Sequence, residues 1–244
     1  MDDGNILTTT FDSLNLKDHL LRGIYSYGFE NPSKIQNEAV PLIINGRDLI
    51  AQAQSGTGKT GAFLIGTLEK IDVSIKGTQI LILAPTHELV HQIHEVASEL
   101  SKFLNISIME VVGGTSVQEC RQGLDKQPHV IIGSPGRVLD MIQKNFLYTD
   151  NLKTLIFDEA DETLSFGFKD TIYNIVKSIP KTCQICLFSA TIPDELLELS
   201  SSFMNNPQKI LVDKEALTLE GITQFFINIR ISDWKYDVLK DLYD

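Results

Sequence analysis

Short apolar runs alternate with amphipathic stretches along most of this 244-residue chain. The apolar runs have the usual length of buried strands. They occupy residues 48–51, 79–84, 107–112, 129–133, 154–157, 184–189 and 209–212. The stretches that predict helices occupy residues 61–65, 87–102, 135–144, 170–178 and 193–203. This alternation predicts an α/β fold with a mostly parallel sheet and helices on both of its faces.

Composition is that of an ordinary globular protein. Apolar residues make up 43% of the sequence, which is enough for a substantial core. No apolar run approaches the roughly 18 residues that cross a membrane, and the N-terminus is too polar for a signal peptide. The odd number of cysteines, 3, fits a reducing compartment. We expect a monomeric intracellular protein without a membrane partner, cytoplasmic or nuclear, with the cytoplasm favoured.

Two of the cysteines, Cys183 and Cys186, form a C-x-x-C spacing inside an apolar run. Positions three apart on a strand point to opposite faces of a sheet. The two thiols therefore cannot readily meet at a metal ion or in a disulfide, and we interpret both as core side chains. Cys120 lies in a polar, helix-like stretch, and we assign it no role.

A glycine-rich run at residues 53–60 follows one apolar run and precedes a helix-like stretch. This is the context that a phosphate-binding loop requires, although Ala53 stands where the strict pattern has glycine. Glycines let backbone N–H groups approach phosphate oxygens, and the next helix adds its positive end. Lys59 can reach the β- and γ-phosphates, and the Thr60 hydroxyl can bind Mg²⁺. The predicted phosphate-binding residues are Ser55, Gly56, Thr57, Gly58, Lys59 and Thr60.

An acidic run, Asp158-Glu159-Ala160-Asp161, follows the apolar run at residues 154–157. A carboxylate at the end of such a strand, that of Asp158, can hold Mg²⁺, in part through water. Glu159 is then placed to orient or deprotonate an attacking water. Acidic residues also favour the first turn of any helix. In combination with the glycine-rich run, however, they predict a nucleotide-hydrolysing site with Lys59, Asp158 and Glu159 as catalytic residues.

Further motifs follow in a fixed order along the chain. Residues 28–36 read Gly-Phe-Glu-Asn-Pro-Ser-Lys-Ile-Gln, residues 85–89 read Pro-Thr-His-Glu-Leu, and residues 113–114 are both glycine. Residues 134–137 read Ser-Pro-Gly-Arg, and residues 189–191 read Ser-Ala-Thr. Together with the two runs above, these motifs resemble the first RecA-like domain of DEAD-box RNA helicases. The resemblance is to the branch of translation initiation factor four-A and its nuclear and exon-junction relatives.

This resemblance implies a RecA-like P-loop NTPase domain with ATP and Mg²⁺ as cofactors and RNA as a sequence-independent partner. It implies that Phe29, Asn31 and Gln36 bind adenine. The Phe29 ring would stack on the base, and the Gln36 amide would hydrogen-bond to it. The residues expected to face RNA are Pro85, Thr86, His87, Gly113, Gly114, Pro135, Gly136 and Arg137. Those expected to couple hydrolysis to strand separation are Asp161, Ser189, Ala190 and Thr191. Protein scaffolds or regulators of the initiation-factor type are expected as further partners.

His87 departs from the family pattern, which has an arginine here to contact RNA phosphate. Histidine is largely neutral at pH 7, so we expect weaker RNA engagement that improves below about pH 6.5. The net charge of −11 also argues against a broad basic face. RNA affinity should therefore be modest and only weakly salt-dependent.

Residues 87–91 read His-Glu-Leu-Val-His, a literal H-E-x-x-H. On a helix, His87 and His91 would share a face and could hold zinc, with Glu88 as the base of a metallopeptidase. However, the run begins in a poorly sheltered first helical turn, and no third ligand follows at a recognised spacing. A zinc metallopeptidase is therefore kept only as an alternative.

By the same resemblance, we expect four segments in the chain. They are an N-terminal tail at residues 1–10, a first RecA-like domain at 11–212, an interdomain linker at 213–221 and an incomplete start of a second RecA-like domain at 222–244. In the last segment, residues 222–230 alternate like a strand and residues 233–244 read as a helix. The family's second domain supplies arginines that complete the γ-phosphate site, and such an arginine is worth about 10³–10⁵ in rate.

The sequence thus predicts an ATP-dependent RNA helicase whose isolated chain hydrolyses ATP very slowly. The alternative within the same family is a non-catalytic half-helicase fragment that binds ATP and RNA. We also expect Lys59 to be an exposed loop lysine, because lysines are rarely buried, so that Lys59→Ala would leave the fold intact.

Overall fold

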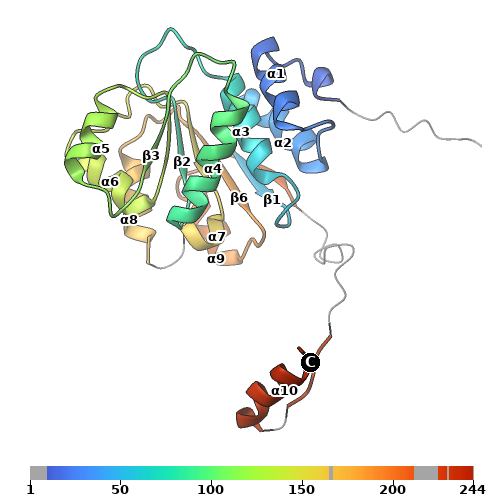
Figure 1. Cartoon of the computed structure of the whole chain (residues 1–244). Helices are drawn as coiled ribbons and strands as arrows, with labels where there is room; N and C mark the ends of the chain where they lie inside the picture. The colour runs from blue at the N-terminus through green and yellow to red at the C-terminus, as the bar shows by residue number, and fades with distance from the viewer. Residues whose placement is uncertain (1–9, 165–166, 212–224, 230, 244) are drawn as a thin grey trace, which may run out of the picture. The chain divides into compact units, whose positions relative to one another are not determined.

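Seven parallel strands form the centre of the protein, in a computed structural model that describes residues 10–164, 167–211, 225–229 and 231–243. In chain order they are β1 (Leu49–Gln52), β2 (Ile80–Leu83), β3 (Ile108–Val111), β4 (Val130–Gly133), β5 (Thr154–Phe157), β6 (Gln184–Ser189) and β7 (Gln208–Ile210). Across the sheet the order is β3-β4-β2-β5-β6-β1-β7, as Figure 1 shows for the labelled strands. Every pairing is parallel. Parallel neighbours need crossover connections, which the intervening helices provide.

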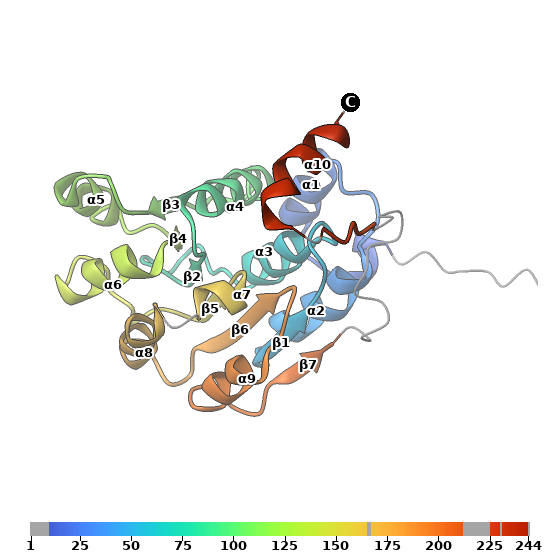
Figure 2. The same ribbon diagram turned by 90° about the horizontal axis from the view of Figure 1, so that it is seen from below.

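Helices cover both faces of the sheet, as the view in Figure 2 shows. One face carries a short 3-10 turn, η1 (Phe11–Leu14), and the helices α1 (Asp18–Tyr27), α2 (Lys34–Ile44), α3 (Lys59–Glu69) and α4 (His87–Leu100). The other carries α5 (Val117–Leu124), α6 (Pro135–Gln143), α7 (Ala160–Thr163), α8 (Lys169–Lys177) and α9 (Asp194–Ser201). The predicted fold class is therefore confirmed.

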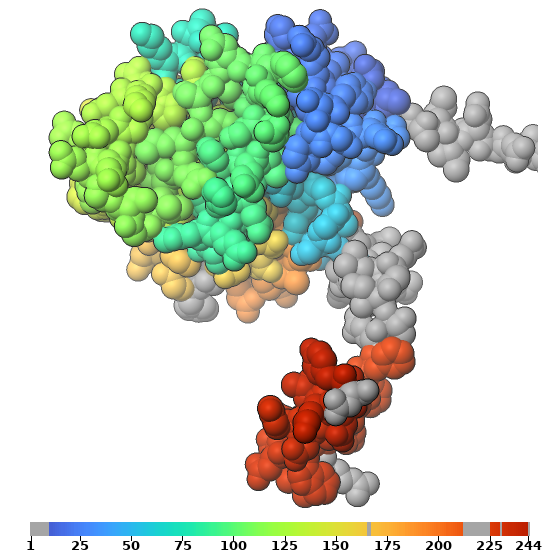
Figure 3. Space-filling model, viewed as in Figure 1, coloured from blue at the N-terminus to red at the C-terminus, as the bar shows by residue number. Residues whose placement is uncertain are grey.

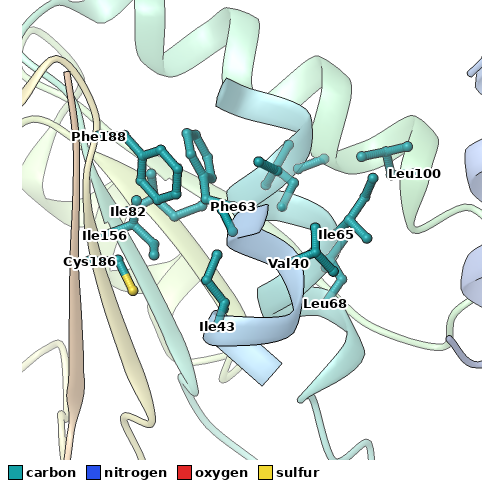
Figure 4. Packing of buried hydrophobic residues seen from close by; sticks show 14 of the residues in the cluster. Val40, Ile43, Phe63, Ile65, Leu68, Ile82, Leu100, Ile156, Cys186 and Phe188 are labelled. Atoms are coloured by element: carbon teal, nitrogen blue, oxygen red, sulfur yellow. The ribbon is translucent and has the colours of Figure 1, made fainter. Parts of the chain in front are cut away.

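Two hydrophobic cores follow from the alternation of side chains along the strands. Ile82 belongs to the core beneath α1 to α4, whereas its neighbour Leu83 belongs to the core beneath the other helices. Figure 4 shows the first core, where Phe63 of α3 meets Phe188 of β6 with ring centroids 5.3 Å apart. Because both faces are buried, the strands are almost continuously apolar, which explains why they stand out in the sequence.

The two cysteines of the C-x-x-C spacing serve opposite cores, as predicted. Cys186 lies in the core beneath α1 to α4, and Cys183 lies in the other core. Both are buried free thiols, and burial raises the pKa of Cys183 to about 12 and also raises the pKa of Cys186. Such thiols remain protonated and unreactive at neutral pH.

All seven predicted strands are present, with ends within two residues of the expected ones. The helix predicted at residues 61–65 is longer than expected, and α1 and α2 were not predicted. In α2 the proline at position 41 interrupts the usual helical signal, yet a capping box at Ser33 and Gln36 starts the helix. No helix in the described part of the chain is long and apolar enough to cross a membrane.

Residues 213–244 form a second compact unit, separate from residues 1–212. It contains a 3-10 turn, η3 (Ser232–Trp234), and the helix α10 (Lys235–Asp241). Together they cover most of the range in which a helix was predicted, residues 233–244. Residues 225–229 do not form a strand, so the prediction for 222–230 is wrong for this part of it. A strand needs a neighbour to pair with, and the described residues of this unit contain no other strand. Three parts of the prediction lie outside the described residues: residues 222–224 and 230 of the expected strand, the linker at 213–221 and most of the tail at 1–10.

Candidate functional site

The predicted site residues lie at one edge of the sheet, where the parallel strands end. The glycine-rich loop follows β1, the acidic run follows β5, and Ser189 ends β6. These three strands are neighbours, and we call their edge the phosphate-loop half. The motifs at residues 85–89, 113–114 and 134–137 follow β2, β3 and β4, which are also neighbours, and we call their edge the His87 half. The segment at residues 28–36 instead connects α1 to α2. Ligands of open α/β sheets bind at this edge, so the arrangement is that of a two-part binding surface.

The loop between β1 and α3 has a backbone suited to phosphate. Gly56 and Gly58 take left-handed φ angles of 80° and 97°, which a side chain would strain. Gly58 directly precedes α3, so the first unpaired N–H groups of that helix face the loop. A Cβ atom at Gly58 would also lie only 2.7 Å from Gln36 Nε2. The backbone angle therefore favours glycine at this position, and a side chain here would also displace the Gln36 amide.

Gln36 connects this loop to the segment at residues 28–36. Its Nε2 donates to the carbonyl oxygen of Gly58 at 3.3 Å, and its Oε1 accepts from the backbone N–H of Ser33 at 2.9 Å. Each amide atom keeps one further hydrogen-bonding position, although Gln36 is only 4% exposed. Gly61 lies against the same segment, because a Cβ atom there would lie 2.6 Å from Gln36 Nε2 and 3.1 Å from the Phe29 ring.

A hollow of about 260 Å³ opens over the loop. Its lining consists of Tyr27, Phe29, Ser55, Gly56, Gly58, Lys59, Thr60, Gly61, Leu89, Val96, Asp158 and Glu159. The structure thus brings the predicted phosphate, adenine and acidic residues together around one space. Asn31, Gln36 and Thr57 are not part of this lining, and Thr57 instead donates its hydroxyl to the Gln54 carbonyl oxygen at 2.7 Å.

Four residues of this lining were not among the predicted site residues: Tyr27, Gly61, Leu89 and Val96. Tyr27 lies edge-on to Phe29 with ring centroids 4.9 Å apart, and the two-residue spacing of these aromatics was an available signal. Leu89 and Val96 come from α4, which packs beside α3. No local pattern could reveal them, because that contact forms only in the folded sheet.

Charged groups meet at the base of the hollow. Lys59 Nζ lies 3.4 Å from Glu159 Oε1. Asp158 is 2% exposed, and its burial, assisted by the nearby charge of Glu159, raises its pKa to about 6. The backbone N–H of Glu159 donates to Asp158 Oδ1 at 3.0 Å. The Asp158 carboxylate and the Thr60 hydroxyl line the same hollow, and oxygen donors of this kind fit a hard divalent cation.

Glu159 occupies an unusual backbone position. Its φ angle of 42° lies in the left-handed region, which non-glycine residues rarely adopt, at the turn from β5 into α7. Such outliers cluster at functional sites, where the surrounding structure holds them. Here the turn directs the Glu159 side chain into the hollow beside Lys59.

The expectation that Lys59 is exposed is wrong, since this residue is only 6% exposed. Lys59 is the first residue of α3, and the walls of the hollow and the carboxylate of Glu159 surround it. Its removal would leave Glu159 without a nearby cation, so Lys59→Ala should lower stability as well as phosphate binding.

The acidic run is tied to residues 189–191. Thr191 donates its hydroxyl to the Asp161 carboxylate, and the backbone N–H of Thr191 donates to Ser189 Oγ at 3.3 Å. Burial opposes ionisation of Asp161, but the hydroxyls of Ser189 and Thr191 outweigh it and lower the pKa of the carboxyl. The Ala190 carbonyl oxygen accepts from Gln52 Nε2 at 3.2 Å. The end of β1 and the segments that follow β5 and β6 are thus linked side by side.

In the His87 half, the start of α4 meets the glycine pair. Thr86 caps α4, accepting from the backbone N–H of Leu89 at 3.2 Å, and Pro85 precedes it. The His87 ring lies against Gly113, where a Cβ atom would be 3.3 Å from His87 Nε2. Gly114 has a φ of 83° and open space around it. The backbone of the glycine pair is therefore accessible beside His87.

Arg137 links the motif at residues 134–137 to the loop that contains the glycine pair. Its guanidinium donates to the Thr115 carbonyl oxygen at 2.9 Å and to Thr115 Oγ1 at 3.3 Å. Pro135 is buried at the first turn of α6, and Gly136 has no heavy atom that a Cβ would meet. Thr115 was missed by the sequence analysis, although it directly follows the glycine pair.

The H-E-x-x-H sequence does not form a metal site. The described residues contain no group of three His, Cys, Asp or Glu side chains that could hold a metal ion. His91 and His94 instead contact Glu110, and His87 lies against Gly113. The zinc peptidase alternative is therefore not favoured.

Comparisons with known proteins agree with this geometry. Residues 33–199 match the sequence family described as DEAD/DEAH box helicase. A protein named ATP-dependent RNA helicase eIF4A, from Neosartorya fischeri, is 53% identical over 238 residues, which cover 98% of this chain and 60% of the relative. The chain thus spans about 60% of the length of the curated relatives that it matches.

Solved structures show the same relationship. S. cerevisiae Dbp5 bound to RNA and ADP BeF3 is similar with a TM-score of 0.88 and 34% identity, over 96% of this chain and 60% of that chain. A Dbp5 variant bound to gle1 and IP6 gives a TM-score of 0.77 and 33% identity, over 96% of this chain and 59% of that chain. The sheet, the ordered motifs and these similarities lead to one conclusion: this chain belongs to the DEAD/DEAH box helicase family.

Proposed function

We propose that this chain is the first RecA-like domain, residues 11–212, of an ATP-dependent RNA helicase, followed by a linker at 213–221 and the start of a second domain at 222–244. One observation carries the proposal above all. The strand order β3-β4-β2-β5-β6-β1 puts the proposed ATP residues and the proposed RNA residues on two adjoining stretches of one sheet edge. A ligand on one stretch can therefore influence the other through a short path.

ATP is proposed to bind in the 260 Å³ hollow. Phe29 and Tyr27 would face the base, and residues 55–60 would hold the phosphates, with backbone N–H groups and Lys59 as donors. Asn31 and Gln36 would contact the base from outside the present lining. The oxygens of Thr60 and Asp158 would hold Mg²⁺, in part through water, and the ion would neutralise phosphate charge when bound.

Hydrolysis would then depend on Glu159. In the structure its carboxylate is paired with Lys59 at 3.4 Å. A γ-phosphate would compete for Lys59 as a stronger anionic partner, and this would free Glu159 to accept a hydrogen bond from the attacking water. The shift of Glu159 would be transmitted to the neighbouring strands through the hydrogen bonds of Asp161, Ser189, Ala190 and Thr191.

RNA would cross the His87 half. Backbone N–H groups near Thr86 and the accessible glycine pair suit phosphate oxygens without reading sequence. Arg137 is held by Thr115 and can turn one of its remaining N–H groups toward a phosphate. The net charge of −11 gives little long-range attraction, so these local contacts would have to carry the affinity.

We further propose a monomer in the cytoplasm, with protein regulators as additional partners. The relatives named eIF4A support the location, and the gle1-bound Dbp5 variant supports regulation by proteins. The alternative, a non-catalytic ATP- and RNA-binding fragment, differs only in whether hydrolysis occurs.

The test is RNA-stimulated ATP hydrolysis by the 244-residue chain, with and without an added second RecA-like domain from a relative. We expect stimulation only when the second domain is present, because its arginines would complete the γ-phosphate site. The Glu159→Gln chain is the matched control and should remain inactive in both cases. Full activity of the chain alone would contradict the proposal that arginines of the second domain complete the γ-phosphate site. ATP binding without hydrolysis in either case would favour the non-catalytic alternative.

A further inference from the structure

Helix α4 presents three different faces. Val90, Ile93 and Ala97 are buried in the core. Leu89 and Val96 line the hollow of the phosphate-loop half. One stripe of the remaining surface carries His87, His91 and His94, at helical spacings of four and three residues. The surface of α4 lies beside that of the blue N-terminal helices in Figure 3, in agreement with the contacts between α4 and α1.

The histidine face meets the edge strand β3 through one carboxylate. Glu110 Oε1 lies 2.9 Å from His91 Nδ1 and 3.2 Å from His94 Nδ1. Glu110 is 27% exposed and stands three residues before Gly113. His87, one turn before His91, touches Gly113. Helix α4 thus meets β3 through the carboxylate, and it meets the loop that follows β3 at the proposed RNA surface.

We propose that Glu110, His91 and His94 form a clamp that positions α4 against β3 and thereby fixes His87 beside Gly113 in the proposed RNA surface. This inference rests on the proposed function. Glu110 is a positioning residue, since it acts on the RNA surface through the two histidines and the strand that bears it. The sequence could not reveal the clamp, because Glu110 lies 19 residues from His91 along the chain.

The clamp depends on protonation. The pKa of His91 is raised by its hydrogen bond to Glu110, by the charge of Glu110 and by that of Glu95 on its own helix. The described residues of α1, α3 and β4, which also pack on α4, place no charged group within ion-pair distance of His91 or His94. The charged link is therefore fully present below about pH 6.5 and is lost as the pH rises through the raised pKa of His91.

A pair of matched variants separates the clamp from simple charge effects. Glu110→Gln and Glu95→Gln each remove one negative charge beside His91, but only Glu110, which lies on β3, links that strand to α4. Charge repulsion alone predicts that both changes tighten RNA binding. The clamp predicts that Glu110→Gln weakens binding of a short oligouridine, with a non-hydrolysable ATP analogue present, by about two- to fivefold at pH 6 and less at pH 8. Binding can be followed by fluorescence anisotropy.

Histidine NMR titration of the same chains gives a readout that needs no RNA. The pKa of His91 should fall toward its ordinary value in Glu110→Gln. Tighter RNA binding by both variants, or a His91 titration that Glu110→Gln leaves unchanged, would overturn the clamp. If no chain binds RNA at all while the His91 titration shifts as expected, the RNA function fails but the link between α4 and β3 stands.

Discussion

The two halves of the sheet edge differ in how far their charged and polar groups are buried. The phosphate-loop half is enclosed: Lys59 and Asp158 are 6% and 2% exposed, and Glu159 pairs with Lys59. The His87 half is open, with His87, Gly114 and Gly136 exposed and an edge strand at its border. Burial strengthens electrostatic interactions, whereas exposed contacts are weakened by water and salt. Substitutions should therefore have large effects in the first half and small effects in the second.

The largest effect is expected for Glu159→Gln. Loss of the group that orients or deprotonates water should lower RNA-stimulated ATP hydrolysis, measured with the second domain added, by about 10²–10⁴-fold. ATP binding should persist, because the amide still fits the site. Glu162→Gln, on the exposed side of the short helix α7 that follows Glu159, is the control and should be neutral. An equal loss in both variants would remove Glu159 from the chemistry.

Lys59→Ala comes next. Loss of one charge-assisted contact to phosphate should weaken ATP binding by about 10- to 100-fold, measured by calorimetry. Because Lys59 is buried against Glu159, the melting temperature should also fall slightly. Lys34→Ala, an exposed lysine at the start of α2, should change neither quantity. Unchanged ATP affinity in Lys59→Ala would show that the loop does not hold phosphate as proposed.

Asp158→Asn should raise the stability of the nucleotide-free protein at neutral and alkaline pH. The folded-state pKa of about 6 lies above the ordinary 3.8, so ionisation of Asp158 lowers stability as the pH rises from about 4 to 6. At pH 8, in the absence of nucleotide and divalent cations, the variant should be more stable by roughly 1–3 kcal/mol in urea unfolding. The gain should vanish near pH 4, where Asp158 is protonated in the native chain. Lower stability at pH 8 would mean that the carboxylate has a structural role.

Of these four changes, His87→Arg in the open half should have the smallest effect. A permanent charge beside Gly113 should tighten ATP-dependent RNA binding by about two- to tenfold at pH 7.5. Gln92→Arg adds the same charge on another face of α4 and controls for general attraction. Equal tightening by both changes would remove His87 from the RNA surface, and no change in either would show that exposed charge matters little here.

Most of the sheet could be predicted, because strands buried on both faces are continuously apolar. The ends of β5 and β6 agree with the predicted residues. The helices α1 and α2 were harder, since Pro41 lies within α2 and short helices carry weak signals. The strand expected at residues 222–230 had the right alternation, but alternation does not supply a partner strand.

The sequence by itself determined the family, the order of the elements and the identity of most site residues, because glycine turns, acidic strand ends and apolar runs are local features with local causes. The tertiary structure decided which residues meet. It brought Leu89 and Val96 to the nucleotide hollow, buried Lys59 beside Glu159, and joined Glu110 to His91. These contacts depend on strand order and helix packing, which bring together residues that are far apart along the chain.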